Sequence, residues 1–249
     1  MRTNKFAVVL ASLFILCGTA FSETAAGLIQ KAKDKSAGVQ QNVKDIKIVS
    51  VSVMEMEGKS MTVTSNICQK GKKIRIDASS IFPGTKEEME TVMIYDGKTT
   101  WMLSPTAGKQ RMEGKAIGLN AISEEEEWWV KLAADIELKG EEKVGEIECY
   151  ILESKTSQNI GKVWIGKKDF VLVKAAGEDE LSGKFEVISS DFKDAGFGWM
   201  LSYKTVMKND KGVTMSSTVK SVEVNKGLKD EFFDPLAVDT EKLKMPKVE

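Results

Sequence analysis

The side chains that most often transfer protons or bind metals are either absent from this 249-residue chain or poorly spaced for that chemistry. The chain has no histidine, which excludes imidazole-based catalytic triads and the H-E-x-x-H zinc helix. Asp77, Glu90 and Asp135 lack the paired spacing that would nominate a general acid and a general base. Asp96 precedes Gly97 in a hairpin signal that explains it structurally. We therefore predict no catalytic residues, no cofactor and a protein that is not an enzyme.

Two clusters of charge also have structural explanations. The acidic run 124–127 follows Ser123 in a capping box, where the positive end of a helix dipole favours carboxylates. A metal site there is the less favoured interpretation, because adjacent helical positions point in different directions. Lys72, Lys73 and Arg75 fit a solvated strand face. With 36 basic and 37 acidic residues and no long basic stretch, the sequence predicts neither a metal site nor a nucleic-acid partner.

Residues 1–22 have the composition of a cleaved signal peptide. Arg2 and Lys5 precede an apolar run over residues 6–17, and small residues follow it up to Ser22. This pattern predicts export and cleavage after Ser22. The apolar run is too short to span a membrane as a helix. A buried N-terminal core helix is the less favoured interpretation.

The three cysteines fall into two groups. Lipidation of Cys17 is disfavoured, because Leu16 stands where a lipoprotein cleavage site requires a small residue. Cys68 and Cys149 would both be exported, and in an oxidising compartment they could be joined by a disulfide. Each also lies in an apolar strand pattern, where a free cysteine is a small hydrophobe. The sequence leaves both alternatives open, since it does not show whether the two strands are neighbours.

The elements that would position these side chains are mostly strands. An amphipathic helix is predicted over residues 23–42, ending near Gly38. Beyond it the apolar period changes from helical spacing to two, with turn signals about every ten residues. A second helix is predicted within 115–134, where the alternation stops. The short connections favour antiparallel pairing.

We expect about eleven strands, including one over residues 197–207, in a single domain that covers residues 23–249 after removal of the signal peptide. Several strands carry large apolar groups on both of their faces. One helix and one helical insertion are too little to cover both faces of so many strands. The sheet is therefore expected to curl, so that its concave side encloses either its own core or a guest. The fold class is mainly β (α+β).

The chain resembles the bacterial LolA-like family of periplasmic outer-membrane lipoprotein-sorting proteins. The resemblance rests on the helix and strand pair up to residue 67, followed by three segments whose order and spacing match. These are 93–105 (MIYDGKTTWMLSP), 162–174 (KVWIGKKDFVLVK) and 219–235 (VKSVEVNKGLKDEFFDP). The similarity spans most of residues 25–235.

This resemblance implies an unclosed antiparallel β-barrel whose concave face is covered by helices and holds acyl chains of a lipoprotein or another lipid. Because Met adapts to irregular apolar shapes, the 12 Met and five Trp of the chain fit such a cavity, although any one of them could simply fill the core. We expect segment 115–134 to form the lid. The predicted cavity residues are Met54, Met56, Met93, Trp101, Met102, Trp128, Trp129, Phe197, Trp199 and Leu201.

The resemblance predicts a monomeric periplasmic carrier that receives acyl chains and moves them toward the outer membrane. Membrane-bound donor and acceptor proteins would be its partners. The alternative is a periplasmic sensor or envelope assembly factor that uses the same fold to bind a protein or lipid ligand without transporting it.

Overall fold

The computed structural model describes residues 23–112, 135–156, 160–180 and 183–245, which form one antiparallel β-sheet of 13 strands with one α-helix. The strands are β1 (Asp45–Met56), β2 (Lys59–Lys70), β3 (Lys73–Ile81), β4 (Glu88–Tyr95), β5 (Thr100–Ser104), β6 (Gly108–Met112), β7 (Glu137–Val144), β8 (Ile147–Glu153), β9 (Ile160–Gly166), β10 (Leu172–Asp179), β11 (Gly183–Asp194), β12 (Met200–Asn209) and β13 (Thr214–Val224). Their order across the sheet is β6-β5-β4-β3-β2-β1-β13-β12-β11-β10-β9-β8-β7.

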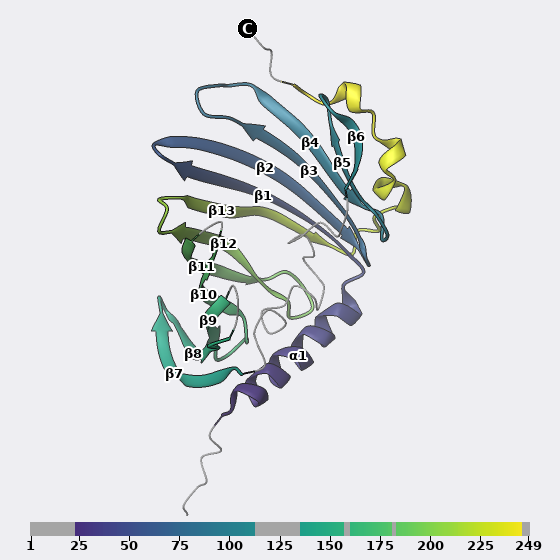
Figure 1. The fold of residues 1–249 in the computed structure, drawn as a ribbon. Helices are drawn as coiled ribbons and strands as arrows, with labels where there is room; N and C mark the ends of the chain where they lie inside the picture. The colour runs from purple at the N-terminus through teal and green to yellow at the C-terminus, as the bar shows by residue number, and fades with distance from the viewer. Residues whose placement is uncertain (1–22, 113–134, 157–159, 181–182, 246–249) are drawn as a thin grey trace, which may run out of the picture.

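Figure 1 shows this sheet curling, with β6 and β7 at its two edges. The predicted mainly β, unclosed antiparallel sheet is confirmed. The sheet has 13 strands where about eleven were expected. The predicted signal peptide, residues 1–22, and the predicted helical lid, residues 115–134, lie outside the described residues.

Local turn chemistry explains the two hairpins that the sequence marks most clearly. Between β1 and β2, Glu57 and Gly58 have φ values of 51° and 73°, as a tight turn between twisted strands requires. Between β4 and β5, the Asp96 carboxylate accepts hydrogen bonds from the backbone N–H groups of Lys98 and Thr99, both at 2.8 Å. Such short turns leave antiparallel pairing as the available geometry.

Helix α1 (Ala25–Asn42) begins at Thr24, whose hydroxyl accepts a hydrogen bond from the Gly27 N–H at 3.1 Å. Its N-terminal half packs against β8, β9 and β10, and its C-terminal end packs against β1. Figure 1 shows the helix crossing between these two parts of the sheet. An 18-residue helix is about 27 Å long, which is sufficient for this crossing. The predicted helix is confirmed and runs one turn beyond Gly38.

Strand β12 begins later than the sequence predicted. Phe197 lies before the strand with a φ of 58°, between Gly196 at 120° and Gly198 at 76°. Three consecutive left-handed residues form a turn and cannot continue a strand. Phe170 also has a left-handed φ, 54°, and β10 begins at Leu172.

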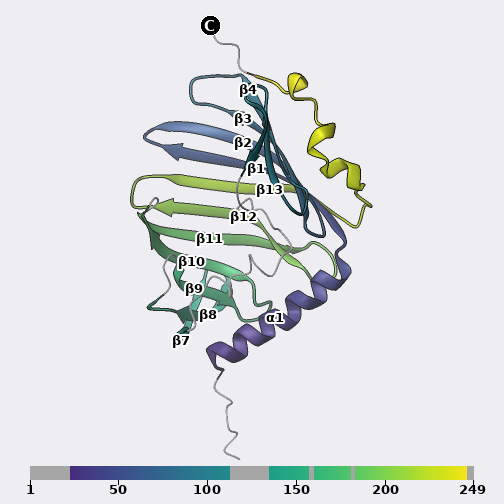
Figure 2. The ribbon, with the colours of Figure 1, turned by 45° about the vertical axis from the view of Figure 1, so that its right-hand side comes forward.

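The C-terminal strap, residues 230–245, crosses β3 to β6 and contains three short 3₁₀ helices, η2 (Asp230–Phe233), η3 (Pro235–Ala237) and η4 (Thr240–Lys242). Figure 2 shows it along one side of these strands. Val238 is buried against Val92, Ile94 and Leu103. The strap is therefore part of the packed structure, although the sequence pattern did not mark it as an element.

Candidate functional site

The strand register divides the side chains of the sheet into two faces. Residues paired directly across antiparallel strands point to the same face. Leu28 of α1 packs against Val163, and Val39 packs against Ile48. The register links these two positions through every strand between them, so both ends of the helix contact one face. We call it the α1 face.

The α1 face is almost free of charge on seven of its strands. On the described strands β1 to β5, β12 and β13, the only charged residue paired in register on this face is Lys59, beside the β1–β2 turn. Nearer the other edge, Glu141 on β7 and Lys193 on β11 also lie on it. The other paired charged residues of the seven strands lie on the opposite face: Asp45, Lys47, Glu55, Lys70, Lys73, Arg75, Asp77, Glu88, Glu90, Lys204, Lys208 and Glu223. The segregation of charge, more than the number of apolar residues, separates the two faces.

Two apolar rows cross the α1 face. The methionine row consists of Met61, Met54, Met215 and Met207, which are cross-strand neighbours on β2, β1, β13 and β12. The isoleucine row consists of Ile48, Ile67 and Ile76 and continues into Met93 and Met102 on β4 and β5. All four side chains of the methionine row are partly exposed, so this end of the face can contact a ligand.

Six of the ten predicted cavity residues lie on this face or pack against it. Met54 belongs to the methionine row, and Met93 and Met102 extend the isoleucine row. Leu201 is packed against Val39 and Val43 of the helix end, together with Trp199 from the turn before β12. Met56 ends β1 on the same face and is 50% exposed.

The structure places two other predicted residues elsewhere. Trp101 lies on the opposite face, where it packs in the cluster under the C-terminal strap and its indole N–H donates to Asp96 at 3.4 Å. Phe197 is in the turn before β12 and is 55% exposed. Trp128 and Trp129 lie outside the described residues.

Cys68 and Cys149 are free and buried in the structure. Cys68 is on β2 and Cys149 is on β8, with six strands between them in the sheet order. A disulfide requires Cα atoms within about 7 Å, and neighbouring strands are already about 4.8 Å apart. The alternative of two separate buried thiols therefore describes this structure.

Sequence reasoning missed Met215 and a set of hydroxyl side chains on the α1 face. It searched for alternation of apolar residues, which fails on β1 because Val51 and Val53 occupy the opposite face. Alternation of charge would have found the face. On β1 the charges, Lys47 and Glu55, have odd numbers, and the even positions from 46 to 56 have none.

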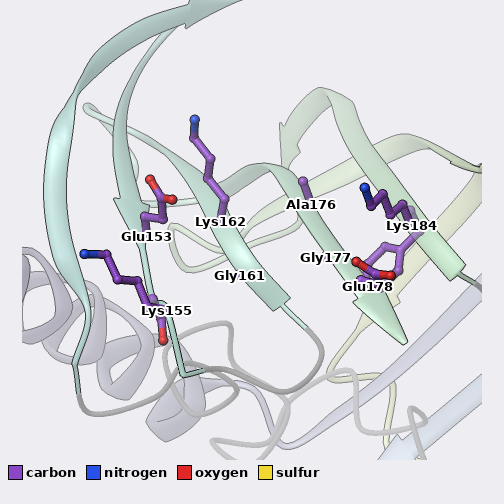
Figure 3. Close-up of a pocket in the computed structure, with 10 residues that line it drawn as sticks. Glu153, Lys155, Gly161, Lys162, Ala176, Gly177, Glu178 and Lys184 are labelled. Atoms are coloured by element: carbon purple, nitrogen blue, oxygen red, sulfur yellow. The ribbon is translucent and has the colours of Figure 1, made fainter. Parts of the chain in front are cut away.

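The depressions on the opposite face differ from the α1 face because charged side chains line them. One of about 660 Å³ lies over β8 to β11 (Figure 3). The charged residues that line it are Glu153, Lys155, Lys162, Glu178 and Lys184. Glu153 pairs with Lys162 and Glu178 with Lys184 across neighbouring strands, so these opposite charges largely compensate one another. A smaller one of about 280 Å³ lies beside Leu243 of the strap and is lined by Arg75, Asp77 and Glu90.

The candidate carboxylates act as acceptors in turns. Hydrogen bonds from the hydroxyls of Ser154 and Thr156 lower the pKa of Asp135. Burial opposes ionisation of Asp96, but the N–H groups of Thr99 and Lys98 outweigh it and lower its pKa. Both groups are ionised at neutral pH and donate no proton. In the part of the chain that the structure describes, no three His, Cys, Asp or Glu side chains are grouped to hold a metal ion.

Within those same residues, no helix has the length and apolar character needed to cross a bilayer.

Comparison with known proteins reveals similarity in structure only. No protein family and no curated protein matches the chain by sequence. A DUF1329 family protein from Desulfovibrio piger is 18% identical with a TM-score of 0.58, covering 85% of this chain and 99% of that one. A putative outer membrane lipoprotein-sorting protein domain from Vibrio parahaemolyticus is 14% identical with a TM-score of 0.57, covering 83% and 94%.

A LolA superfamily protein from Nitrosomonas europaea is 15% identical with a TM-score of 0.53, covering 86% of this chain and 98% of that chain. In all three cases the similarity extends over nearly the whole of the solved chain. The curled sheet crossed by one helix is therefore the architecture of these proteins, and the chain described here has a LolA-like fold.

Proposed function

We propose that the chain is a periplasmic carrier that holds acyl chains of a lipoprotein or another lipid on the α1 face and moves them toward the outer membrane. The observation that carries this proposal is the partly exposed α1 face, on which strands β1 to β5, β12 and β13 carry no charge apart from Lys59 while their other charged residues lie on the opposite side. Each CH₂ group moved from water to such a surface gains about 0.8 kcal/mol. One long acyl chain gains on the order of 10 kcal/mol before ordering costs. Binding of this kind needs no catalytic group.

The known structures add support at the level of fold. One of them is described as a putative outer membrane lipoprotein-sorting protein domain. We extend that function to this chain, together with export by residues 1–22, cleavage after Ser22 and one monomeric domain over residues 23–249. Partners would be a donor and an acceptor at the two membranes.

The proposal is tested by the lipid that accompanies the protein from cells. The purified chain is extracted with organic solvent, the extract is analysed by mass spectrometry, and binding of a fluorescent fatty acid is measured. We expect co-purified lipid and saturable probe binding. If neither is found, the non-transport alternative, a sensor or envelope assembly factor, becomes the better explanation.

Adjacent serines on β13 provide a matched pair of variants. Ser217 lies on the α1 face and Ser216 on the opposite face. Ser217→Lys places a cation among apolar groups and should abolish lipid retention, whereas Ser216→Lys should retain it. Circular dichroism checks that both variants fold. Equal lipid retention by the two would show that the lipid does not lie on the α1 face.

A further inference from the structure

A band of hydroxyl side chains separates the two apolar rows of the α1 face. We call it the hydroxyl trough, and it consists of Ser50, Ser52, Ser65, Thr205 and Ser217. Ser52 and Ser217 are directly paired on β1 and β13, and the Ser52 hydroxyl donates to Ser217 at 3.1 Å. Thr205 on β12 pairs with Ser217, and Ser65 on β2 pairs with Ser50. Figure 2 shows β1, β13 and β12 side by side at the centre of the sheet.

The serines and the valines of β1 occupy the opposite faces from those that the stability of the folded sheet alone would favour. Serine packs poorly in strand interiors, where β-branched residues are preferred. On β1 the valines at 51 and 53 face the charged side of the sheet, while Ser50 and Ser52 face the uncharged side. Val63 and Val219 pair with Ser52 and Ser50 on the uncharged side, so each of these two serines has a valine as one cross-strand neighbour.

Ser50 is the member of the trough whose hydroxyl lacks a hydrogen-bond partner among the residues that the structure describes. Ser50 is only 8% exposed. Buried hydroxyls in folded proteins almost always have a partner. The unpartnered hydroxyl points toward the same face as Ser52 and Ser217, so the missing acceptor or donor belongs on the α1 face.

The chemistry of the face restricts what that partner can be. A phosphate or carboxylate would need a nearby cation or several donors. On these strands the α1 face offers only Lys59 at its end, and Lys193 of the neighbouring β11 is already paired with Asp191 at 3.2 Å and lies over the Tyr203 ring. An ester carbonyl is a neutral acceptor that a serine hydroxyl can satisfy. Met54 and Ile48, which mark the two rows, are six residues apart on β1, or about 20 Å. Acyl chains on either side of an ester group would fit across these rows.

We infer that the hydroxyl trough binds the ester carbonyls of an uncharged acyl ester whose chains lie on the methionine row and the isoleucine row. This inference rests on the proposed function, because it assigns the chemical class of the lipid held at the same face. It makes the ester group a determinant of specificity, in addition to chain length.

The test compares lipids that differ in one functional group. Dioleoylglycerol, its diether analogue and dioleoyl phosphatidic acid are each used to displace a fluorescent apolar probe from the full chain. We expect the diester to bind about tenfold more tightly than the diether, since a few hydrogen bonds of ordinary strength separate them. Phosphatidic acid should bind more weakly than the diester, because its charge has no counter-ion.

Two variants locate the effect. The first is a triple variant that combines Ser50→Ala, Ser52→Ala and Ser217→Ala. It should lose the preference for the diester and bind the diether as the wild type does. Ser216→Ala with Ser221→Ala, on the opposite face of β13, should keep the preference. If the control loses the preference as well, or if wild type binds diester and diether equally, the hydroxyl trough is not an ester site. If phosphatidic acid binds as tightly as the diester, the restriction to uncharged esters is wrong.

The same experiment separates this inference from the proposed function. Equal binding of all three lipids leaves a carrier without ester recognition, whereas no displacement of the probe by any of them removes the carrier itself. A diacylglyceryl-modified peptide, run alongside free diacylglycerol, then distinguishes an acylated protein from a free lipid as the source of the ester.

Discussion

At the scale of single residues, burial controls the chemistry of the two cysteines in the described chain. Desolvation raises the pKa of the Cys68 thiol to about 11, and it also raises the pKa of Cys149. Because the thiolate is the reactive form, both thiols should be inert in the native protein at neutral pH, even in an oxidising compartment.

We predict that the thiol reagent DTNB modifies neither Cys68 nor Cys149 in the native mature chain at pH 8 and modifies both after denaturation without reductant. Absorbance of the released thiolate measures the reaction. The raised pKa values mean that Cys68 should react only as the pH approaches about 11 or as the chain unfolds, and that Cys149 should likewise be protected at pH 8. A denatured chain that still lacks two reactive thiols would indicate a disulfide, contrary to the structure.

Residue identity alone could not assign each side chain to a face. Met54 and Trp101 are both large and apolar and both lie on predicted strands, yet they point to opposite sides of the sheet. The difference depends on the register between strands that are far apart in sequence, such as β1 with β13. A shift of one residue would exchange the faces, so sequence spacing within one strand is insufficient.

At the scale of elements, α1 joins parts of the sheet that lie far apart in the strand order. Leu28 is completely buried against β8, β9 and β10, while Val39 and Val43 are buried against β1 at the other end of the helix. The helix therefore fixes the curl of the sheet, because strands β11 to β13 between these anchors are held at both sides.

We predict that Leu28→Ala lowers the free energy of unfolding by about 2–5 kcal/mol, as expected when a fully buried leucine leaves a cavity. Hydrogen exchange should rise first in β8 to β10, which lose this contact. Lys33→Ala, an exposed position on the same helix, is the matched control and should change stability by less than about 0.5 kcal/mol. Urea denaturation measures both. Equal effects of the two substitutions would contradict the anchoring role of Leu28.

The C-terminal strap is held to the sheet by a cation–π contact, by hydrogen bonds and by ion pairs, in addition to its apolar packing. The Arg75 guanidinium lies 4.2 Å from the centre of the Phe232 ring and donates to the Phe232 carbonyl at 3.1 Å. Hydrogen bonds from Lys73 and Lys70 lower the pKa of Asp230, and a hydrogen bond from Lys244 lowers that of Glu88. The carboxylates thus favour the attached strap only while they are ionised.

We predict that acid loosens the strap. A folded-state pKa below the unfolded value means that the stabilisation is present above the unfolded pKa, about 4 for these groups, and is lost as the pH falls through the folded values. NMR signals of residues 230–245 should therefore shift as the pH falls below about 4, before the sheet unfolds. In a combined Asp230→Asn and Glu88→Gln variant this early shift should be absent. Its persistence would assign the transition to other groups.

The elements themselves were predictable wherever local chemistry determines them. The β4–β5 hairpin follows from Asp96 and its two backbone donors, and α1 follows from a cap and a helical period. The start of β12 was not predictable by the same rules, because aromatic residues favour strands and Phe197 is held in the left-handed region by its flanking glycines. The strap escaped prediction because 3₁₀ turns have no apolar period long enough to recognise.

At the scale of the whole molecule, an exposed uncharged face has an energetic cost that a ligand would remove. The methionine row is partly exposed in the described structure, as are all members of the hydroxyl trough apart from the buried Ser50. Extended apolar surface of this kind is uncommon on soluble proteins unless something binds there. A ligand that binds only the folded chain adds to its stability by mass action. The stability of the protein and the filling of its α1 face are therefore linked.

We predict that the delipidated chain melts at a lower temperature than the chain with bound lipid. At a free ligand concentration 100 times the Kd, binding adds about 2.7 kcal/mol, which raises the melting temperature by roughly 5–10 °C for a chain of this size. Differential scanning calorimetry with and without an acyl ester measures the shift. Ser216→Lys should show the full shift and Ser217→Lys almost none, because only the second places a charge on the α1 face. The shift should also be nearly independent of salt, since strands β1, β2, β12 and β13, which carry the methionine row and the hydroxyl trough, present no paired charge on this face apart from Lys59. A shift that disappears at high ionic strength would instead place the ligand on the charged side of the sheet.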